Sequence, residues 1–160
     1  MTAFDRLVTL LDEHQAEYRL IDHAPVGQTD LVSALRGHDV REAAKCIILL
    51  VKTDRKSKFV LAVIPGDARV DLGAVQRLAG GRSVHFAQQH VAETLSGCVA
   101  GTILPFALDD RLNLIVDPGV ADSETMYFNA GRLNRSVALR TADYLRIARP
   151  RIEKIAVLQP

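Results

Sequence analysis

The sequence of 160 residues contains no tryptophan and only two cysteines, and aromatic residues make up 5% of it. Cys46 and Cys98 have no Cys or His companion at the spacing of metal ligands, so we expect two reduced core residues, with no disulfide and no metal site. No apolar run approaches the ~20 residues that span a membrane, and the N-terminus lacks a basic region followed by an apolar block. These absences favour a cytoplasmic protein that does not engage membranes.

Motifs of several common enzyme classes are also missing. The chain has no Gly-x-Ser-x-Gly elbow, no phosphate-binding Gly-x-x-x-x-Gly-Lys, no dinucleotide fingerprint and no Cys-x-x-Cys, so we expect no cofactor. The formal net charge of +1 gives no overall signature of nucleic-acid binding. Residues 131–160, however, hold seven Lys or Arg against Asp143 and Glu153. This bias would suit a modest phosphate-contacting surface, and a simple solvated face would show it too.

The chain is organised around an apolar segment, residues 46–51, that is too short for a membrane helix and lacks helical periodicity. Its branched side chains predict a strand buried on both faces of a sheet. The polar residues 52–58 predict a turn, and residues 59–64 predict a returning strand.

Helices are expected at residues 2–15, 29–36, 72–79, 88–95 and 141–149, and further strands at 18–23, 83–86, 112–116, 126–129, 136–139 and 155–158. Thr29, Asp71 and Thr141 are the expected N-terminal caps, and the second helix is expected to bury Leu31, Val32 and Leu35. Strands and helices mix without strict alternation. We therefore predict one α/β domain over residues 1–160, a mixed and mostly antiparallel central sheet flanked by helices.

Two features of the sequence could carry chemistry. Lys45 stands at the start of the central strand, where it either extends to water or presents a fixed cation to an anionic or carbonyl oxygen. In residues 97–106, Gly-Cys-Val-Ala-Gly-Thr-Ile-Leu-Pro-Phe, glycines lie four residues apart and a proline follows after four more. Such a loop can aim backbone N–H groups at an ester carbonyl, and it can equally be a strand bend that needs glycine for packing.

Ala44-Lys45 before an apolar strand, followed by Gly97-x-x-x-Gly101-x-x-x-Pro105-Phe106, resembles the YbaK/prolyl-tRNA-synthetase-associated (ProX-like) editing domain family. The resemblance runs from His23 to the last helix and includes the turn Asn129-Ala130-Gly131-Arg132. It departs from the family at Ala107, where members often carry glycine.

The resemblance implies a YbaK-like fold and a free-standing trans-editing enzyme that hydrolyses mischarged aminoacyl-tRNA carrying Ala, Ser, Thr or Cys. Its partner would be the acceptor end of tRNA. Lys45 and Gly101 would be catalytic, with water attacking the ester directly and the 2′-hydroxyl of the terminal ribose helping to activate it. The implied substrate-binding residues are His23, Thr29, Thr102, Ile103, Leu104, Pro105, Phe106 and Asn129.

Other interpretations remain open from the sequence. Asn129 could satisfy its own turn, and His23 could be an ordinary surface or core imidazole. Asp117, at a strand end, is a further carboxylate of interest. The same pocket could also serve a non-catalytic binding module for an aminoacyl-adenylate-like or nucleotide ligand, since no protein base is evident, and Lys45 and the glycines could be purely architectural.

Overall fold

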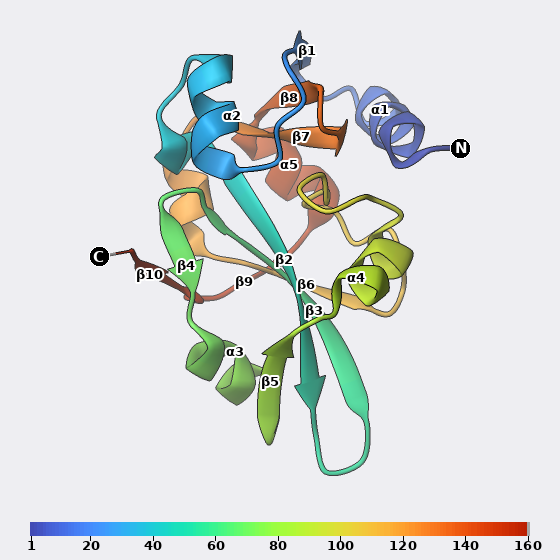
Figure 1. Ribbon diagram of the computed structural model, residues 1–160, viewed down its shortest axis with the longest axis vertical. Coiled ribbons are helices and arrows are strands. Elements are labelled where there is room, and N and C mark those ends of the chain that lie inside the picture. The colour runs from blue at the N-terminus through green and yellow to red at the C-terminus, as the bar shows by residue number, and fades with distance from the viewer. Residues whose placement is uncertain (160) are drawn as a thin grey trace.

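A long β-hairpin runs through the molecule and the other elements pack around it (Figure 1). The computed structural model describes residues 1–159. Its helices are α1 (Ala3–Glu13), α2 (Thr29–Arg36), α3 (Leu72–Leu78), α4 (Gln89–Ser96) and α5 (Thr141–Ala148), with short 3-10 turns at Val40–Glu42 and Pro118–Asp122. Its strands are β1 (Tyr18–Asp22), β2 (Ala44–Lys52), β3 (Ser57–Pro65), β4 (Ala68–Val70), β5 (Ser83–Phe86), β6 (Leu112–Val116), β7 (Thr125–Arg132), β8 (Arg135–Arg140), β9 (Arg151–Ile152) and β10 (Ala156–Leu158).

The strands form one larger sheet and two smaller ones. The larger sheet has the order β5-β2-β3-β6-β9, in which β3–β6 and β6–β9 are parallel and the other pairs antiparallel. A second sheet, β1-β8-β7, is antiparallel throughout, as is the pair β10–β4. The predicted α/β class with a mixed, mostly antiparallel sheet is confirmed.

The central strand is buried on both faces, as its apolar run predicts. Ile48 belongs to the core cluster that packs against α1, the β1-β8-β7 sheet and residues 104–106. Leu49 and Val51 belong to a second cluster on the other face, with α3, β4 and β10. Because successive side chains of a strand point to opposite faces, β2 divides the two clusters. Among residues 1–159, no helix has the length and hydropathy needed to cross a membrane.

The predicted inner face of α2 is confirmed at Val32 and wrong at Leu31 and Leu35. Leu31 and Leu35 are about half exposed, whereas the buried residues are Val32, Ser33 and Arg36. The helix is therefore rotated so that a charged residue faces inward, a choice that apolar periodicity alone cannot reveal.

Two predicted caps and one predicted turn are also corrected. The side chain of Thr29 does not cap α2, which begins after Gln28, and the buried Thr141 hydroxyl has no hydrogen-bond partner within residues 1–159. Asp71 does cap α3, with its carboxylate accepting from the Ala74 N–H at 3.1 Å. Asn129 lies inside β7 and not in a turn, because an irregularity in the β7–β8 pairing carries the strand on to Arg132.

Candidate active site

Lys45, Gly101, Thr29, Ile103 and Asn129, all predicted site residues, line one small cavity. It lies where the start of β2 meets α2, β7 and the loop of residues 97–105, and it has a volume of about 140 Å³. Val32 and Arg36 of α2, together with Ala44, Cys46, Phe128 and Gly27, complete its wall. Four segments far apart in the sequence therefore converge on one recess.

Lys45 is half-buried and lies near the start of β2, in the part of that strand that β5 does not pair with. Its ammonium donates to the Ala68 carbonyl of β4 at 2.6 Å. Burial lowers the pKa of this lysine below its usual range, and the carboxylates of Asp67 and Asp30 oppose that shift. Lys45 also borders two neighbouring grooves, so its remaining N–H groups are placed where three recesses meet.

Gly101 approaches the loop of residues 25–28 backbone to backbone. Its φ of +85° is in the left-handed region, and a Cβ at this position would lie 2.8 Å from the Gly27 Cα. Any side chain would therefore force the two loops apart. The Thr102 N–H donates to Val99 O at 3.0 Å, whereas within residues 1–159 the N–H groups of Gly101 and Ile103 have no protein acceptor.

Asn129 connects both loops to the sheet. Its amide nitrogen donates to Val26 O at 2.9 Å and to Gly101 O at 3.0 Å, and its oxygen accepts from the Ser136 hydroxyl at 2.9 Å. The Ser136 oxygen also accepts from Arg36 Nη1 at 3.0 Å and lies 2.6 Å from His23 Nε2. A continuous hydrogen-bond network thus runs from α2 through β8 and β7 to the rim of the cavity.

Arg36 is the unexpected member of this network, because it is a cation only 9% exposed. Its other contacts are the His38 ring, 2.9 Å from Nε, and the Ser33 hydroxyl, 3.4 Å from Nη2. No carboxylate lies within ion-pair distance of it among residues 1–159. Burial accordingly lowers the pKa of Arg36 to about 10, so the group remains charged at neutral pH.

His38 supports Arg36 in the neutral form. Its Nδ1 lies 2.8 Å from the Asp39 carbonyl oxygen, which can only accept a hydrogen bond, so Nδ1 carries the proton. Nε2 is then unprotonated, and its lone pair accepts the Arg36 N–H. The ring also stacks on Tyr127 with centroids 3.7 Å apart. Burial lowers the pKa of His38, which favours this neutral tautomer.

The structure does not bring every implied binding residue to the cavity. Thr102, Leu104, Pro105 and Phe106 are buried elsewhere: the Thr102 hydroxyl donates to Val99 O, and the Pro105 carbonyl accepts from the Tyr144 hydroxyl. Phe106 packs edge-on against the rings of Phe128 and Tyr144. His23 contacts Ser136, which in turn donates to Asn129, and it does not line the cavity.

Arg36 and Ser136 are the functional candidates that sequence reasoning missed. A lone serine in a strand and an arginine at the end of a helix are ordinary surface residues by composition, and nothing in their spacing indicates burial. Cys46 also lines the cavity, but burial raises the pKa of its thiol, so it is not a thiolate nucleophile.

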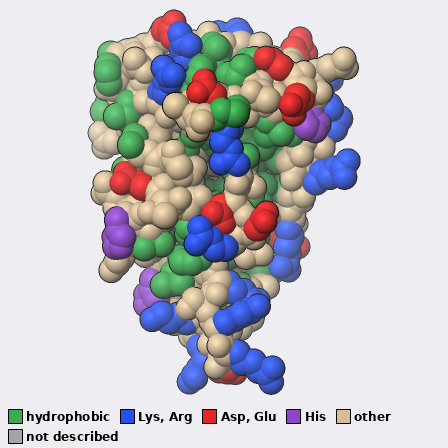
Figure 2. Space-filling model, turned by 90° about the vertical axis from the view of Figure 1, so that its right-hand side faces the viewer, with side chains coloured by type: hydrophobic (Ala, Val, Ile, Leu, Met, Phe, Trp, Pro, Cys, Tyr) green, Lys and Arg blue, Asp and Glu red, His purple; other side chains and the backbone are tan. Residues whose placement is uncertain are grey.

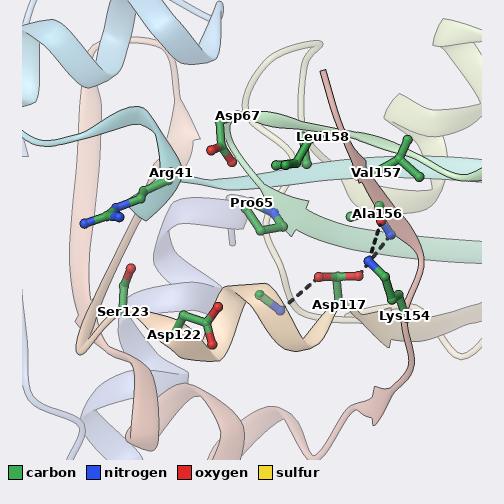
Figure 3. A pocket seen from close by; sticks show the side chains of 12 residues that line it. Arg41, Pro65, Asp67, Asp117, Asp122, Ser123, Lys154, Ala156, Val157 and Leu158 are labelled. Atoms are coloured by element: carbon green, nitrogen blue, oxygen red, sulfur yellow. Dashed lines mark hydrogen bonds between the residues drawn. The ribbon is translucent and has the colours of Figure 1, made fainter. Parts of the chain in front are cut away.

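A larger groove of about 340 Å³ lies beside Asp117 and Lys154 (Figure 3). The Asp117 carboxylate accepts three backbone N–H groups, from Gly119, Ile155 and Ala156, each at 2.9 Å. These hydrogen bonds connect the end of β6 to the C-terminal strand, so we assign Asp117 a structural role.

The cations of residues 131–160 do not form one surface. Arg135 pairs with Asp22, Arg140 and Arg146 pair with Asp143, Arg151 pairs with Glu153, and Arg132 packs over the ring of Phe4. Much of the positive charge in this segment is therefore compensated locally, which makes it a weak candidate for a phosphate-contacting surface.

Comparison with known proteins identifies the family of the chain. Residues 23–147 match the sequence model of the aminoacyl-tRNA editing domain. Over 148 residues the chain is 37% identical to the multifunctional Ser/Thr-tRNA deacylase ProXp-y of Escherichia coli K12, covering 92% of this chain and 89% of that protein.

Solved structures show the same fold. A hypothetical protein superposes with a TM-score of 0.85 at 22% identity, covering 95% of this chain and 99% of its own. A candidate trans-editing enzyme for prolyl-tRNA synthetase superposes with a TM-score of 0.81 at 15% identity, covering 98% of both chains. The chain belongs to the aminoacyl-tRNA editing domain family.

Proposed function

We propose that this editing domain removes serine or threonine from the 3′ end of mischarged tRNA, with the cavity around Lys45 and Gly101 as its active site. The observation that carries the proposal is the convergence of Lys45, Gly101, Thr29, Ile103 and Asn129 on one recess. The similarity to a Ser/Thr-tRNA deacylase at 37% identity supports the choice of amino acid.

The size of the cavity restricts what can enter it. Pockets for drug-sized molecules run from about 300 to 1,000 Å³, and this one measures about 140 Å³. A short amino-acid side chain fits that space, whereas a nucleotide has to stay outside it. The proposal therefore places the amino acid in the recess and the terminal adenosine at its mouth.

The chemistry of the wall suits a hydroxylated side chain. Thr29 and Arg36 supply polar groups beside the apolar Val32 and Ile103, whereas both N–H groups of Asn129 are already bound to backbone carbonyls. A site that hydrogen-bonds a substrate hydroxyl rejects analogues that lack it, because its own buried polar groups are then unpaired. A single methyl group discriminates by only about 1–3 kcal/mol, so the proposal expects both serine and threonine to be accepted.

The proposed mechanism is direct attack by water on the ester. The unsatisfied N–H groups of Gly101 and Ile103 would donate to the carbonyl oxygen as negative charge develops, and the Lys45 ammonium would offset that charge. Within residues 1–159 the cavity wall contains no carboxylate and no imidazole. The proposal therefore leaves activation of the water to the 2′-hydroxyl of the terminal ribose.

The test is hydrolysis of tRNAs charged with Ser, Thr, Ala, Cys and Pro by the wild type and by Lys45→Ala. We expect Ser- and Thr-tRNA to be deacylated fastest and the variant to lose about 100-fold or more in kcat/KM, the usual effect of removing a group that stabilises an oxyanion. Lys154→Ala is the matched control, because Lys154 also donates to a backbone carbonyl, that of Ala156 at 3.0 Å, but borders the groove of Figure 3. Hydrolysis no faster than in buffer for all five substrates would refute the proposal.

A further inference from the structure

We propose that a second groove beside Lys45 binds the unpaired nucleotides at the 3′ end of tRNA, with Phe86 as the platform on which a base stacks. This inference rests on the proposed function, since it places the nucleic acid that the reaction requires. The groove has a volume of about 510 Å³, and Lys45, Ile47, Arg69, Leu72 and Phe86 are among the residues that line it. Lys45 borders both recesses, so the groove and the amino-acid cavity are neighbours at this residue.

The pairing of β2 with β5 fixes the position of Phe86 relative to Lys45. Lys45, Ile47 and Leu49 alternate along β2 and share one face, and Leu49 lies directly opposite Phe86. Phe86 is therefore four residues along the strand from Lys45, about 13 Å at 3.3 Å per residue. That span accommodates a short stretch of single-stranded RNA whose terminal ester is at Lys45.

Phe86 is a large apolar side chain that folding leaves 60% exposed. Its ring has no aromatic partner within the part of the chain that the structure describes. Aromatic side chains presented in this way stack on nucleobases, and each such contact contributes about 1–3 kcal/mol with little preference for sequence. The apolar floor formed by Ile47, Val70 and Leu72 offers the same kind of surface next to the ring.

The charges favour this exit from the active site over the other one. A different groove, between Thr29 and Gly66, also borders Lys45, and it contains Asp30 and Asp67, which repel phosphate. The groove at Phe86 contains Arg69, which is exposed, and one acid, Asp71, which is engaged in capping α3. An RNA strand leaving the active site therefore has a lower electrostatic energy along β2 towards Phe86.

The cationic tip of the β2–β3 hairpin continues the same path. Beyond Phe86, β2 leads to Lys52 and the turn residues Arg55 and Lys56, all exposed, with Asp54 paired to Arg82. Figure 2 shows Lys and Arg side chains gathered at this lower end of the molecule. The amino-acid cavity, an aromatic platform and a basic tip thus follow one strand in the order that an ester, unpaired bases and a phosphate backbone would need.

The experiment is a binding cycle with uncharged tRNA and with the same tRNA lacking its unpaired 3′ nucleotides, using the wild type, Phe86→Ala and Phe86→Trp. We expect Phe86→Ala to weaken binding of the intact tRNA by about 5- to 100-fold, corresponding to the stacking of one base, and to leave binding of the truncated tRNA unchanged. Phe86→Trp restores binding, because it keeps an aromatic face. Leu158→Ala, at another exposed apolar position (77%), changes neither Kd.

Several results would overturn the inference. Equal loss of binding for intact and truncated tRNA, or no loss for either, removes Phe86 from contact with the 3′ end. A change in oligomeric state on Phe86→Ala would assign the ring to an interface between protein molecules. Arg69→Gln provides a second test, in which tRNA binding is measured at several salt concentrations. If Arg69 contacts a phosphate, the slope of log K against log salt should fall in magnitude by about 1 in this variant.

The outcome is separable from that of the proposed function. If the wild type hydrolyses Ser- or Thr-tRNA while the binding cycle shows no effect, only the groove assignment fails. If the cycle behaves as expected but no charged tRNA is hydrolysed, the groove stands and the deacylase assignment falls.

Discussion

Removing the Ser136 hydroxyl should weaken the fold where side-chain hydrogen bonds connect α2, β7 and β8. In Ser136→Ala the Asn129 oxygen, on a residue 7% exposed, loses its donor, and Arg36 Nη1 loses its acceptor. A buried polar group left without a partner costs about 1–3 kcal/mol, and a charged group costs more. The free energy of unfolding should therefore fall by about 2–5 kcal/mol. For a chain of this length that corresponds to a decrease in Tm of about 4–20 °C.

Urea denaturation measures this loss, and Ser33→Ala provides the matched control. Ser33 is equally buried and contacts the same guanidinium, but only at 3.4 Å and from the other nitrogen. Its removal should cost clearly less than removal of Ser136. In the double variant Arg36→Met/Ser136→Ala the two effects should not add, because the lost acceptor no longer leaves a cation unpaired. A loss below about 1 kcal/mol for Ser136→Ala, or full additivity in the double variant, would refute the role given to this network.

Three further results are expected. The rate of deacylation should fall at alkaline pH as Lys45 loses its proton, and the fall should begin below the usual pKa of 10.5 because burial lowers the pKa of this lysine. Lys45→Arg should move the fall in rate to higher pH. An unchanged pH profile in Lys45→Arg would point to another group. Folding lowers the pKa of His38, so the unfolded state binds more protons and the free energy of unfolding should fall as the pH drops below about 6.5. Urea midpoints measured against pH should show this slope in the wild type and lose it in His38→Asn, which lacks the titrating acceptor of Arg36. A slope that persists in His38→Asn would contradict the assignment. Gly101→Ala should lower the free energy of unfolding by about 2 kcal/mol or more, because its φ is +85° and the new Cβ would lie 2.8 Å from the Gly27 Cα. Gly97→Ala, with a φ of +70° and no atom within 4 Å of the new Cβ, should lower it by about 1–2 kcal/mol. Equal losses in thermal unfolding would show that the close approach at Gly101 is unimportant.

Local patterns in the sequence were sufficient to predict the elements of the fold. The apolar run of β2 and its polar turn predicted the central hairpin, and Asp71 predicted the start of α3, because each of these signals acts within a few residues. The rotation of α2 was mispredicted for the opposite reason. Its inward residue, Arg36, is stabilised by Ser136, which lies 100 residues away in the sequence, and no local pattern reports such a partner.

The loop of residues 97–106 shows a similar limit. Its glycine spacing predicted a site, and Gly101 and Ile103 do line the cavity. Thr102, Leu104, Pro105 and Phe106 are buried in the protein instead. The sequence indicated the loop, but only packing against the core decides which of its residues reach the cavity.

The two cations of the cavity differ in what their surroundings leave them to do. Arg36 has five N–H groups in a rigid fork and uses three of its nitrogens on His38, Ser33 and Ser136, so its position is fixed by the fold. Lys45 uses one N–H on a single carbonyl at the end of a flexible stem. Arg36 therefore supplies a constant positive potential and a rigid rim, and the Lys45 ammonium is the group that can follow charge as it develops. A buried arginine without a carboxylate partner is expensive to maintain, which is consistent with a site that receives its negative charge only during the reaction.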